Sequence, residues 1–477
     1  MDSNLVKARS SIVWILAIVL AFSAVWWIER ETGRELIARS GAAAPAPAAA
    51  GAAAPGALAP VADAPAAAAL GGPAVTVSVA APLLPASLDL PADPAPRTLS
   101  PTEQAWARTA WRYFESNTDA GTGLASSVQG FPSATLWDTG SYLMAILSAH
   151  ELGILDQATV DKRLALALAS LARLPLFGAA LPNKVYDTRS LALTDYGNRP
   201  SAAGVGWSAI DIGRLLVPLH MIAWRQPRHA EAVRRVISRW NTAPLVSDGQ
   251  LFGMSVADGG TATWVQEGRL GYEQYAARSL ALMGLDVEVA SSWREQMALV
   301  EIEGIPVPVD RRAAPSGGAQ NFLVSEPLIL TGLEFGWDRS SREVAWRLLR
   351  AQQERYRRTG VLTAVTEDHV DQAPYFVYNS VFHAGRSWVA VTERGEDAQA
   401  LRSLSVKAAF GWHALYRNGY TERLVQGVAA LNDPARGWYA GLYEADGRPN
   451  RALTANTNGV VLESLAFITR GPALRHR

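Results

Sequence analysis

The sequence predicts an all-α domain, an (α/α)6 toroid of about six inner and outer helix pairs. From residue 101 onward, apolar residues recur at helical spacing, and strand-like alternation is confined to short pieces such as residues 361–366. Several helices come in pairs, in which an apolar helix introduced by tryptophan precedes a more charged one. Because burial sets how much of a helix surface must be apolar, such pairs indicate a buried inner helix beside a partly solvated outer one.

The predicted helices follow one another from residue 102 to residue 469. The apolar segment 207–224 and the more charged segment 229–240 form the clearest pair. The full set of predicted helices is 102–115, 139–152, 157–173, 207–224, 229–240, 268–283, 290–300, 326–335, 341–358, 398–416, 422–431 and 457–469.

An apolar run near the N-terminus predicts a membrane anchor. The run from Ile12 to Ile28 is uncharged, long enough to cross a bilayer, and closed by Trp26 and Trp27. Positive charge is in excess on its N-terminal side, so residues 1–11 should stay in the cytoplasm. We therefore expect a single-pass protein of the inner membrane with its C-terminal domain in the periplasm. A cleaved signal peptide is the alternative, but no small-x-small cleavage site directly follows the run.

Residues 29–98 form the predicted linker. From residue 41 to about residue 96 the composition is dominated by Ala and Pro, which cannot bury enough apolar surface to offset the entropy of ordering. We expect a disordered, semi-stiff spacer. The helical toroid domain then occupies residues 99–477.

Composition excludes several classes of function. The 44 Lys and Arg residues of this 477-residue chain balance its 44 Asp and Glu residues, so we expect no nucleic-acid partner. The absence of cysteine excludes a disulfide framework, a Cys-ligated zinc site and a cysteine nucleophile. His369 and His383 lack partners at metal-ligand spacing, and no Gly-rich phosphate loop or GxSxG motif occurs. We expect no metal and no cofactor.

Unusual residues cluster at the predicted starts of the inner helices. If these helices run parallel, all of the starts face one end of the toroid. Most of them carry an acid, an amide or an indole. The six predicted starts are 137–141 (WDTGS), 206–211 (GWSAID), 264–269 (WVQEGR), 324–327 (VSEP), 383–388 (HAGRSW) and 454–458 (TANTN).

Acids at these starts are the candidate catalytic residues: Glu267, Asp138, Glu326 and Asp211. Glycoside cleavage needs one protonated carboxyl for the leaving oxygen and one charged carboxyl. Glu267 is the preferred general acid, with Asp138 or Glu326 as its partner. The apolar residues before Glu267 would raise its pKa, although the nearby Arg269 would lower it. Three loop acids are further candidates: Glu367, Asp368 and Asp371.

Helix capping offers a simpler explanation for the same acids. Asp138 and Ser325 are ordinary N-cap residues, and Glu267 and Glu326 lie where a helix dipole favours a carboxylate. Capping gives no reason for the neighbouring Trp and Gly residues. Their company favours a sugar site, since indoles offer flat faces for C–H stacking while acids and amides bind hydroxyls.

Polar and aromatic residues at the same starts, and in the loops 183–206 and 366–386, are the candidate substrate-binding residues. Simple core packing of the tryptophans and surface connection by the loops stay open as alternatives. The candidates are Trp137, Trp207, Trp264, Gln266, Tyr272, Tyr196, Lys184, His383, Arg386, Trp388, Asn456 and Asn458.

Six ordered blocks resemble a bacterial family, the domain of unknown function 3131. The blocks are LWDTGSYLMAILSAHELGIL, LPNKVYDT, GWSAIDIGRLL, WVQEGRLGYEQYAA, SEPLILTGLEFG and ALTANTNGVVLESL. The resemblance spans residues 99–471. It implies an (α/α)6 glycoside-hydrolase-like fold and a periplasmic glycan substrate linked to β-glucan or exopolysaccharide systems. By block position it implies Trp137, Asp138, Trp207, Asp211, Gln266, Glu267, Tyr272, Glu326, Asn456 and Asn458 as site residues.

Three functions remain open at this point. The leading hypothesis is a membrane-anchored periplasmic glycoside hydrolase or transglycosylase that acts on a polysaccharide or oligosaccharide. The second is a non-catalytic glycan-binding or assembly component of an exopolysaccharide-synthesis system. The third is a lyase on acidic polysaccharide, which would use Tyr272 or His383 as a base and Arg386 to bind uronate carboxylates.

Overall fold

The computed structural model describes residues 90–256, 260–294, 296–312 and 320–474, together with Pro73 and Val77–Ser78. All of these belong to the second of two compact units, Pro60–Arg477. The predicted anchor and most of the predicted linker lie outside the described residues. Within the described part of the chain, no helix is long and apolar enough to cross a membrane.

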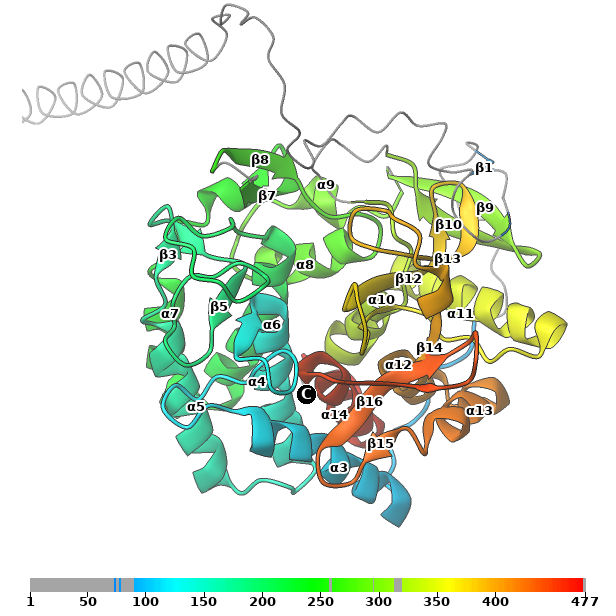
Figure 1. The fold of residues 1–477 in the computed structure, drawn as a ribbon, viewed down its shortest axis with the longest axis horizontal. Coiled ribbons are helices and arrows are strands. Elements are labelled where there is room, and N and C mark those ends of the chain that lie inside the picture. Colours follow the sequence, from blue (N-terminus) through cyan, green and yellow to red (C-terminus); the bar gives the residue numbers. More distant parts are fainter. Residues whose placement is uncertain are drawn as a thin grey trace, which may run out of the picture. The chain divides into compact units, whose positions relative to one another are not determined.

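Inner helices form a closed ring in the second unit (Figure 1). Each inner helix packs against the next, and the last packs against the first. Helix α10 (Glu326–Leu330) continues into a π-helical turn, η3 (Thr331–Phe335). The inner helices are α4 (Leu136–Glu151), α6 (Ala209–Arg225), α8 (Tyr272–Ala281), α10 (Glu326–Leu330), α12 (Val406–Tyr416) and α14 (Ala455–Arg470).

Outer helices pack on this ring, one against each inner helix, so the described residues contain six inner and outer pairs. The longest outer helix, α11, buries an apolar face that includes Val344 and Leu348, while its other face carries arginines. The outer helices, in the order of their partners α14, α4, α6, α8, α10 and α12, are α3 (Pro101–Asn117), α5 (Gln157–Leu171), α7 (Ala230–Ile237), α9 (Glu288–Ser291), α11 (Arg339–Thr359) and α13 (Gly419–Val428).

The prediction of an all-α class is wrong in one respect, because small antiparallel sheets connect many of the helices. The strands are β1 (Val77–Ser78), β2 (Ser133–Thr135), β3 (Leu176–Phe177), β4 (Leu181–Pro182), β5 (Val185–Asp187), β6 (Val246–Ser247), β7 (Gln250–Val256), β8 (Ala262–Gln266), β9 (Met297–Ile302), β10 (Ile305–Asp310), β11 (Glu367–His369), β12 (Phe376–His383), β13 (Arg386–Val391), β14 (Ser403–Ser405), β15 (Asn432–Asp433), β16 (Gly437–Tyr443) and β17 (Pro449–Leu453). Short 3-10 turns are η1 (Pro227–His229), η2 (Ala243–Leu245) and η4 (Gln399–Leu401).

Two-residue turns explain the largest errors. Residues 290–300 were predicted as one helix, but α9 ends at Ser291 and β9 begins at Met297. The predicted inner-helix start at 383–388 is the turn of the β12–β13 hairpin. In each hairpin the turn is a residue followed by glycine, both at positive φ (Glu303 53° and Gly304 75°; Ala384 47° and Gly385 77°). Such turns match the twist of paired strands, so they specify hairpins.

The fifth inner helix, α12, starts at Val406, after β14. The predicted helix 398–416 is therefore correct only from residue 406 onward. The alternating segment 361–366 forms no strand, and β11 begins directly after it.

Hydroxyl N-caps mark four of the inner starts. Thr135, Ser208, Ser405 and Thr454 each accept a hydrogen bond from the backbone N–H three residues later.

Glycines let the inner helices approach closely near their starts. A Cβ added at Gly213 of α6 would lie 2.7 Å from the Ala276 Cβ of α8, and one at Gly459 of α14 would lie 3.0 Å from the Ser141 carbonyl of α4. Because these contacts join the second turns of neighbouring helices, the inner helices run parallel. Their N-terminal ends therefore share one face of the ring.

One buried arginine links five of the six inner helices. Arg214 of α6 forms ion pairs with Glu334, which follows α10, and with Glu463 of α14, the latter at 2.7 Å. Its guanidinium also donates to the hydroxyl of Tyr275 of α8 (3.1 Å) and to that of Ser141 of α4 (3.3 Å). Arg214 and Glu334 are fully buried. This network joins the helices through charges that water does not reach.

We expect Arg214→Met to lower the free energy of unfolding by about 3–5 kcal/mol, because two buried carboxyls would lose their cation. Denaturant unfolding of the purified chain followed by tryptophan fluorescence measures this. Arg112→Met, which removes an exposed pair with Glu115 on α3, is the matched control and should change stability little. Equal unfolding midpoints for the two variants would show that the network does not hold the ring together.

Candidate active site

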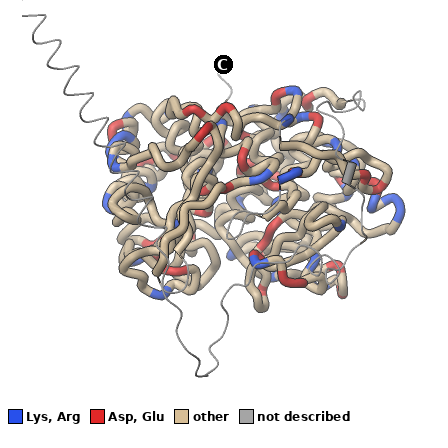
Figure 2. Tube along the Cα trace, turned by 90° about the horizontal axis from the view of Figure 1, so that it is seen from above, with Lys and Arg blue, Asp and Glu red and all other residues tan. Residues whose placement is uncertain are grey.

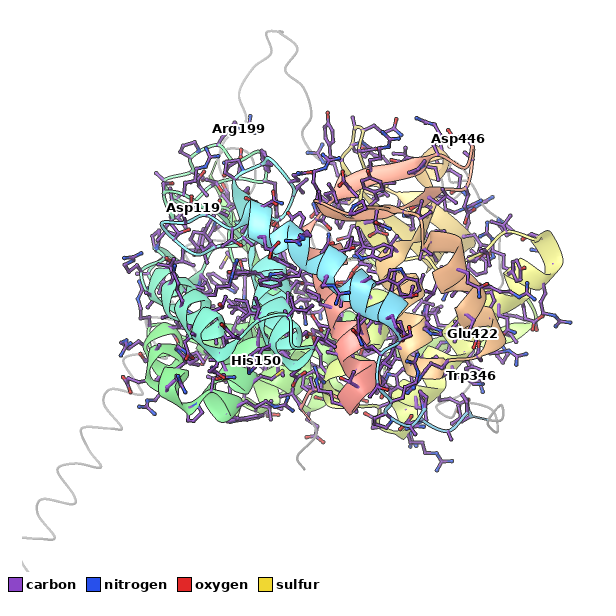
Figure 3. All side chains as sticks on the ribbon, turned by 90° about the horizontal axis from the view of Figure 1, so that it is seen from below. Asp119, His150, Arg199, Trp346, Glu422 and Asp446 are labelled. Carbon is purple, nitrogen blue, oxygen red and sulfur yellow. The ribbon has the colours of Figure 1, made fainter. Side chains whose placement is uncertain are left out.

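Every inner helix places a polar or aromatic side chain on the face at its N-terminal end, within its first three residues. In Figure 3, Arg199 and Asp446 lie in loops on this side of the ring, and His150 at the end of α4 lies on the opposite side. The six side chains are Asp138 of α4, Asp211 of α6, Tyr272 of α8, Glu326 of α10, Lys407 of α12 and Asn456 of α14.

Asp211 and Glu267 form a first group of carboxyls on this face. Asp211 lies in the first turn of α6 and is half-buried. Burial raises the pKa of Asp211 to about 7, and the charge of Glu267 raises it further, whereas Lys184 opposes the shift. Asp211 therefore holds a proton over part of the neutral pH range while its side chain still reaches solvent.

Glu267 lies against the start of α6. Its Oε2 accepts a hydrogen bond from the backbone N–H of Ala209 (2.6 Å). The approach depends on Gly253 of β7, because a Cβ there would lie 2.7 Å from the same oxygen. Burial raises the pKa of Glu267, while Lys184 and the amides at the start of α6 favour the charged form.

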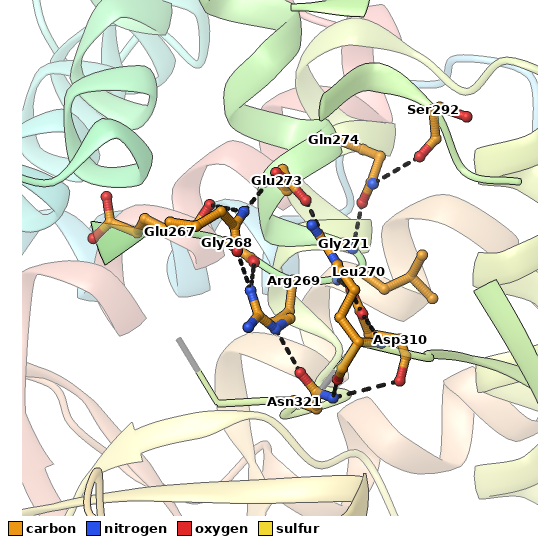
Figure 4. A network of polar contacts seen from close by, with 12 residues as sticks. Glu267, Gly268, Arg269, Leu270, Gly271, Glu273, Gln274, Ser292, Asp310 and Asn321 are labelled. Atoms are coloured by element: carbon orange, nitrogen blue, oxygen red, sulfur yellow. Dashed lines mark hydrogen bonds and ion pairs between the residues drawn. The ribbon is translucent and has the colours of Figure 1, made fainter. Parts of the chain in front are cut away.

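A polar network fixes the loop that carries Glu267 (Figure 4). Gln266 donates to the Glu267 carbonyl and to the carboxyl of Glu273, each at 3.0 Å. Arg269 donates to the side chains of Gln266 and Asn321, the latter at 2.6 Å. Arg269, predicted to lower the pKa of Glu267, is thus bound to other groups, and Lys184 supplies the opposing charge.

Glu326 and Lys407 form the centre of a second, buried group. Glu326 forms an ion pair with Lys407 and accepts hydrogen bonds from the Trp137 indole N–H and the Asn456 amide, both at 2.8 Å. Burial, the largest single effect, would raise the pKa of Glu326, but the Lys407 charge and the hydrogen bonds from Lys407, Asn456 and Glu367 together lower it. Glu326 is 1% exposed, so its charged and hydrogen-bonded carboxylate is also enclosed by protein.

Two further acids surround Lys407. Burial and the charge of Glu326 raise the pKa of Glu367 to about 8. Burial raises the pKa of Asp368 to about 7, although Lys407, 3.6 Å from its Oδ1, opposes this. The other oxygen of Asp368 is buried without a hydrogen-bond partner. Three acids thus share one cation, which favours protonation of Glu367 and Asp368 near neutral pH.

Aromatic residues lie between the two groups. Tyr378 of β12 interacts electrostatically with Asp211 of the first group and with Glu367 and Glu326 of the second. The Tyr272 hydroxyl contacts Glu367, and its ring packs edge-on against Trp137 (centroids 5.8 Å apart). The half-buried rings of Trp137, Tyr272 and Tyr378 therefore connect both carboxyl groups.

Asp138 lies close to the first group. Its Oδ2 accepts a hydrogen bond from the Thr135 hydroxyl at 2.7 Å, so it takes part in capping α4 as well as in the charge around Asp211. The expectation that Asp138 is itself the N-cap is wrong, because Thr135 is the N-cap of α4 and Asp138 lies in the first turn. Glu326 lies in the first turn of α10, but its carboxylate binds side chains of three other helices and not the N-terminal amides.

Some predicted substrate-binding residues lie away from these carboxyls. Trp388 donates to Glu303 at 2.9 Å and packs under Arg355 of α11. Asn458 is fully buried and bonds to the backbone of Trp438. Burial lowers the pKa of His383 to about 4, and its ring packs on Phe322.

The remaining candidates differ in exposure. Trp207 is 6% exposed and packs against Phe177. Trp264 and Tyr196 are largely exposed, and Tyr196 interacts electrostatically with Asp211. Arg386 lies in the β12–β13 hairpin beside His383.

Lys407 is the site residue that sequence reasoning missed. It is the single charged residue of the apolar helix VKAAFGWHALY, and it follows the N-cap Ser405. A lysine buried on an inner helix needs acid partners, so this pattern was a signal for Lys407 itself, but its partners Glu326 and Asp368 are identified only by the fold. Among the described residues, no group of three or more His, Cys, Asp or Glu side chains could hold a metal ion.

Solved structures similar to this chain share its fold. A "putative glucoamylase" from Bacteroides caccae ATCC 43185 has 13% identity and a TM-score of 0.55, with 77% of this chain and 93% of that chain covered. An endo-β-1,2-glucanase from Chitinophaga pinensis, bound to sophorotriose and glucose, has 12% identity and a TM-score of 0.55, with 78% of this chain and 94% of that chain covered. An endo-β-1,2-glucanase mutant from Talaromyces funiculosus, bound to β-1,2-glucan, has 11% identity and a TM-score of 0.50, with 77% of this chain and 84% of that chain covered.

These likenesses show a helix-rich domain with small sheets of the (α/α)6 toroid type. No curated protein matches the chain. Residues 105–471 match the model of the family described as "Protein of unknown function (DUF3131)", which confirms the resemblance seen in the six sequence blocks, and the chain belongs to this family.

Proposed function

We propose that the toroid is a glycoside hydrolase that cleaves a neutral, β-linked glucan at the face carrying Asp211 and Glu267. The observation that carries the proposal is Asp211: a half-buried carboxyl with a pKa of about 7, beside a second carboxyl of raised pKa. Glycoside cleavage needs a carboxyl that is still protonated near neutral pH and a charged partner.

The contacts favour Asp211 over Glu267 for the role of general acid. Asp211 donates its proton to the glycosidic oxygen as the bond to the anomeric carbon breaks. Glu267 is held by the N–H of Ala209 and lies beside Lys184, which both favour its charged form. Its negative charge stabilises the positive charge that develops on the sugar ring. Water then adds its hydroxyl to the anomeric carbon, and the proton that it releases restores the acid form of Asp211.

The charges of the face support a neutral substrate. Two lysines, Lys184 and Lys407, face a larger number of carboxyls, which are those of Asp138, Asp211, Glu267, Glu326, Glu367, Asp368 and Glu393. An acidic polysaccharide would be repelled there, which disfavours a lyase. Elsewhere acidic and basic residues alternate along the trace (Figure 2). The glucans acted on by the similar structures make β-1,2-glucan the first substrate to test.

We also propose that residues 12–28 anchor the chain in the inner membrane and hold the toroid in the periplasm. The apolar run and the excess of positive charge before it support this placement. A periplasmic toroid would meet glucans secreted across the membrane, which accords with a role beside exopolysaccharide or β-glucan synthesis.

We expect the wild-type chain to release oligosaccharides from β-1,2-glucan. Asp211→Asn and Glu267→Gln should each lower kcat/KM by about 10²–10⁴, because each removes a proton-transferring or charge-stabilising carboxyl. Chromatography and mass spectrometry of products, from a panel that adds β-1,3-glucan, β-1,4-glucan and starch, measure this. Asp446→Asn, in an exposed turn, is the control and should retain full activity.

The panel also separates the alternatives. Products that persist in both variants would move the acid to another carboxyl and overturn the assignment of Asp211. Binding to a glucan without any product would instead support the glycan-binding component, and products that absorb in the ultraviolet would identify a lyase.

We expect activity to fall as pH rises through about 7, because Asp211 must hold its proton. Lys184 lowers the pKa of Asp211, so Lys184→Gln should move this alkaline limb of the kcat/KM profile to higher pH. Initial rates from pH 4 to pH 10 measure the shift. An unchanged or lower limb in Lys184→Gln would contradict the role given to Asp211.

A further inference from the structure

Large apolar side chains that remain exposed are unevenly distributed over the described residues. Six such side chains occur, and four of them are aromatic residues in segments that lead into the inner helices. Their exposed fractions are 37% for Phe131, 55% for Tyr196, 47% for Trp264 and 65% for Tyr375. A single exposed apolar residue is ordinary, so these aromatics point to binding only through their common position around the carboxyl face.

Backbone contacts tie two of these aromatics to the carboxyl face. Trp264 of β8 is paired with Met254, whose N–H donates to the carbonyl of Trp207 just before α6. Tyr196 lies in the loop before α6 and interacts electrostatically with Asp211 and Glu267. Both side chains thus lie on the α6 and α8 side of the carboxyls.

The other two aromatics lie on the far side. Tyr375 occupies the turn between β11 and β12, and β11 carries Glu367. Phe131 lies two residues after Gln129, whose N–H donates to Leu453 immediately before α14. The carboxyl groups therefore lie between Tyr196 and Trp264 on one side and Tyr375 and Phe131 on the other.

The structure of the β7–β8 hairpin keeps the Trp264 ring outward. The ring stacks on Phe252 of the paired strand with centroids 4.4 Å apart, and its N–H donates to the Pro244 carbonyl at 3.3 Å. This holds the indole in one orientation with one face free. The two remaining exposed residues, Trp224 and Leu282, lie at the C-terminal ends of α6 and α8, away from the carboxyls.

We propose that Phe131, Tyr196, Trp264 and Tyr375 form a track that binds sugar rings of one polysaccharide chain on both sides of the carboxyls, so that the domain cuts within chains and not at their ends. Aromatic faces bind the C–H faces of sugar rings and tolerate their hydroxyls at the edges. Because the track extends on both sides, it accepts a long β-linked glucan. The inference rests on the proposed function for its substrate class.

Binding tests the track without catalysis. In native gels that contain β-1,2-glucan, the full chain purified in detergent should be retarded. Trp264→Ala and Tyr375→Ala should each weaken retardation by about tenfold in apparent Kd, the size expected for one lost aromatic contact. Trp224→Ala removes an equally exposed tryptophan at the opposite end of α6, so it is the matched control and should bind as the wild type does.

Product length tests the mode of cleavage. With long β-1,2-glucan, we expect the chain length to fall steeply before short sugars accumulate. Trp264→Ala and Tyr375→Ala should raise KM for the polymer about tenfold, whereas Trp224→Ala should leave that KM unchanged. Release of only mono- or disaccharides from the start, or equal KM values for the variants and the Trp224→Ala control, would overturn the track.

The two experiments separate this inference from the proposed function. Binding that depends on Trp264 and Tyr375 in a chain that cuts no glucan would support the track and refute the hydrolase. Hydrolysis that is indifferent to both residues would support the hydrolase and refute the track.

Discussion

The ring depends on the ion pairs that Arg214 forms at its axis. A guanidinium buried among helices must find charged partners, and here Glu334 and Glu463 approach it from α10 and α14. The same side chain lies near Trp137, whose indole N–H binds Glu326 on the carboxyl face. The group that holds the inner helices together is therefore connected, through one tryptophan, to the residues that position the candidate site.

Both carboxyl groups follow one electrostatic rule: more acids than cations in a place with little water. The charge of Lys184 acts on Asp211 and Glu267, and the charge of Lys407 acts on Glu326, Glu367 and Asp368. Glu326 forms the direct ion pair with Lys407 and is charged, so its neighbour Glu367 keeps its proton more firmly. Unequal sharing of a cation thus creates charged and neutral carboxyls side by side, which a single capping acid could not do.

The sequence was informative where local physics dominates. Helical periodicity predicted the ring and the paired helices, and acids and amides marked the starts at Asp138, Asp211, Glu326 and Asn456. Residue-glycine turns such as Glu303–Gly304 were read as helix or loop, so hairpins were missed. The pairing of Lys407 with Glu326 and the binding of Arg269 to Asn321 join residues far apart in the chain, which no spacing reveals. Trp388 and Asn458 were predicted to bind substrate because of their residue types, but Trp388 donates a hydrogen bond to Glu303 and Asn458 accepts one from the backbone of Trp438.

The hairpins described above have a consequence for how such a domain can change. Their strands pair mainly with each other, and tight turns such as Ala384–Gly385 close them without help from the ring. The helices, by contrast, pack so closely at Gly213 and Gly459 that they have no room for a larger side chain. Lengthening or exchanging a hairpin would therefore leave helix packing intact, so relatives built on the same ring are free to diverge in ligand choice through insertions alone.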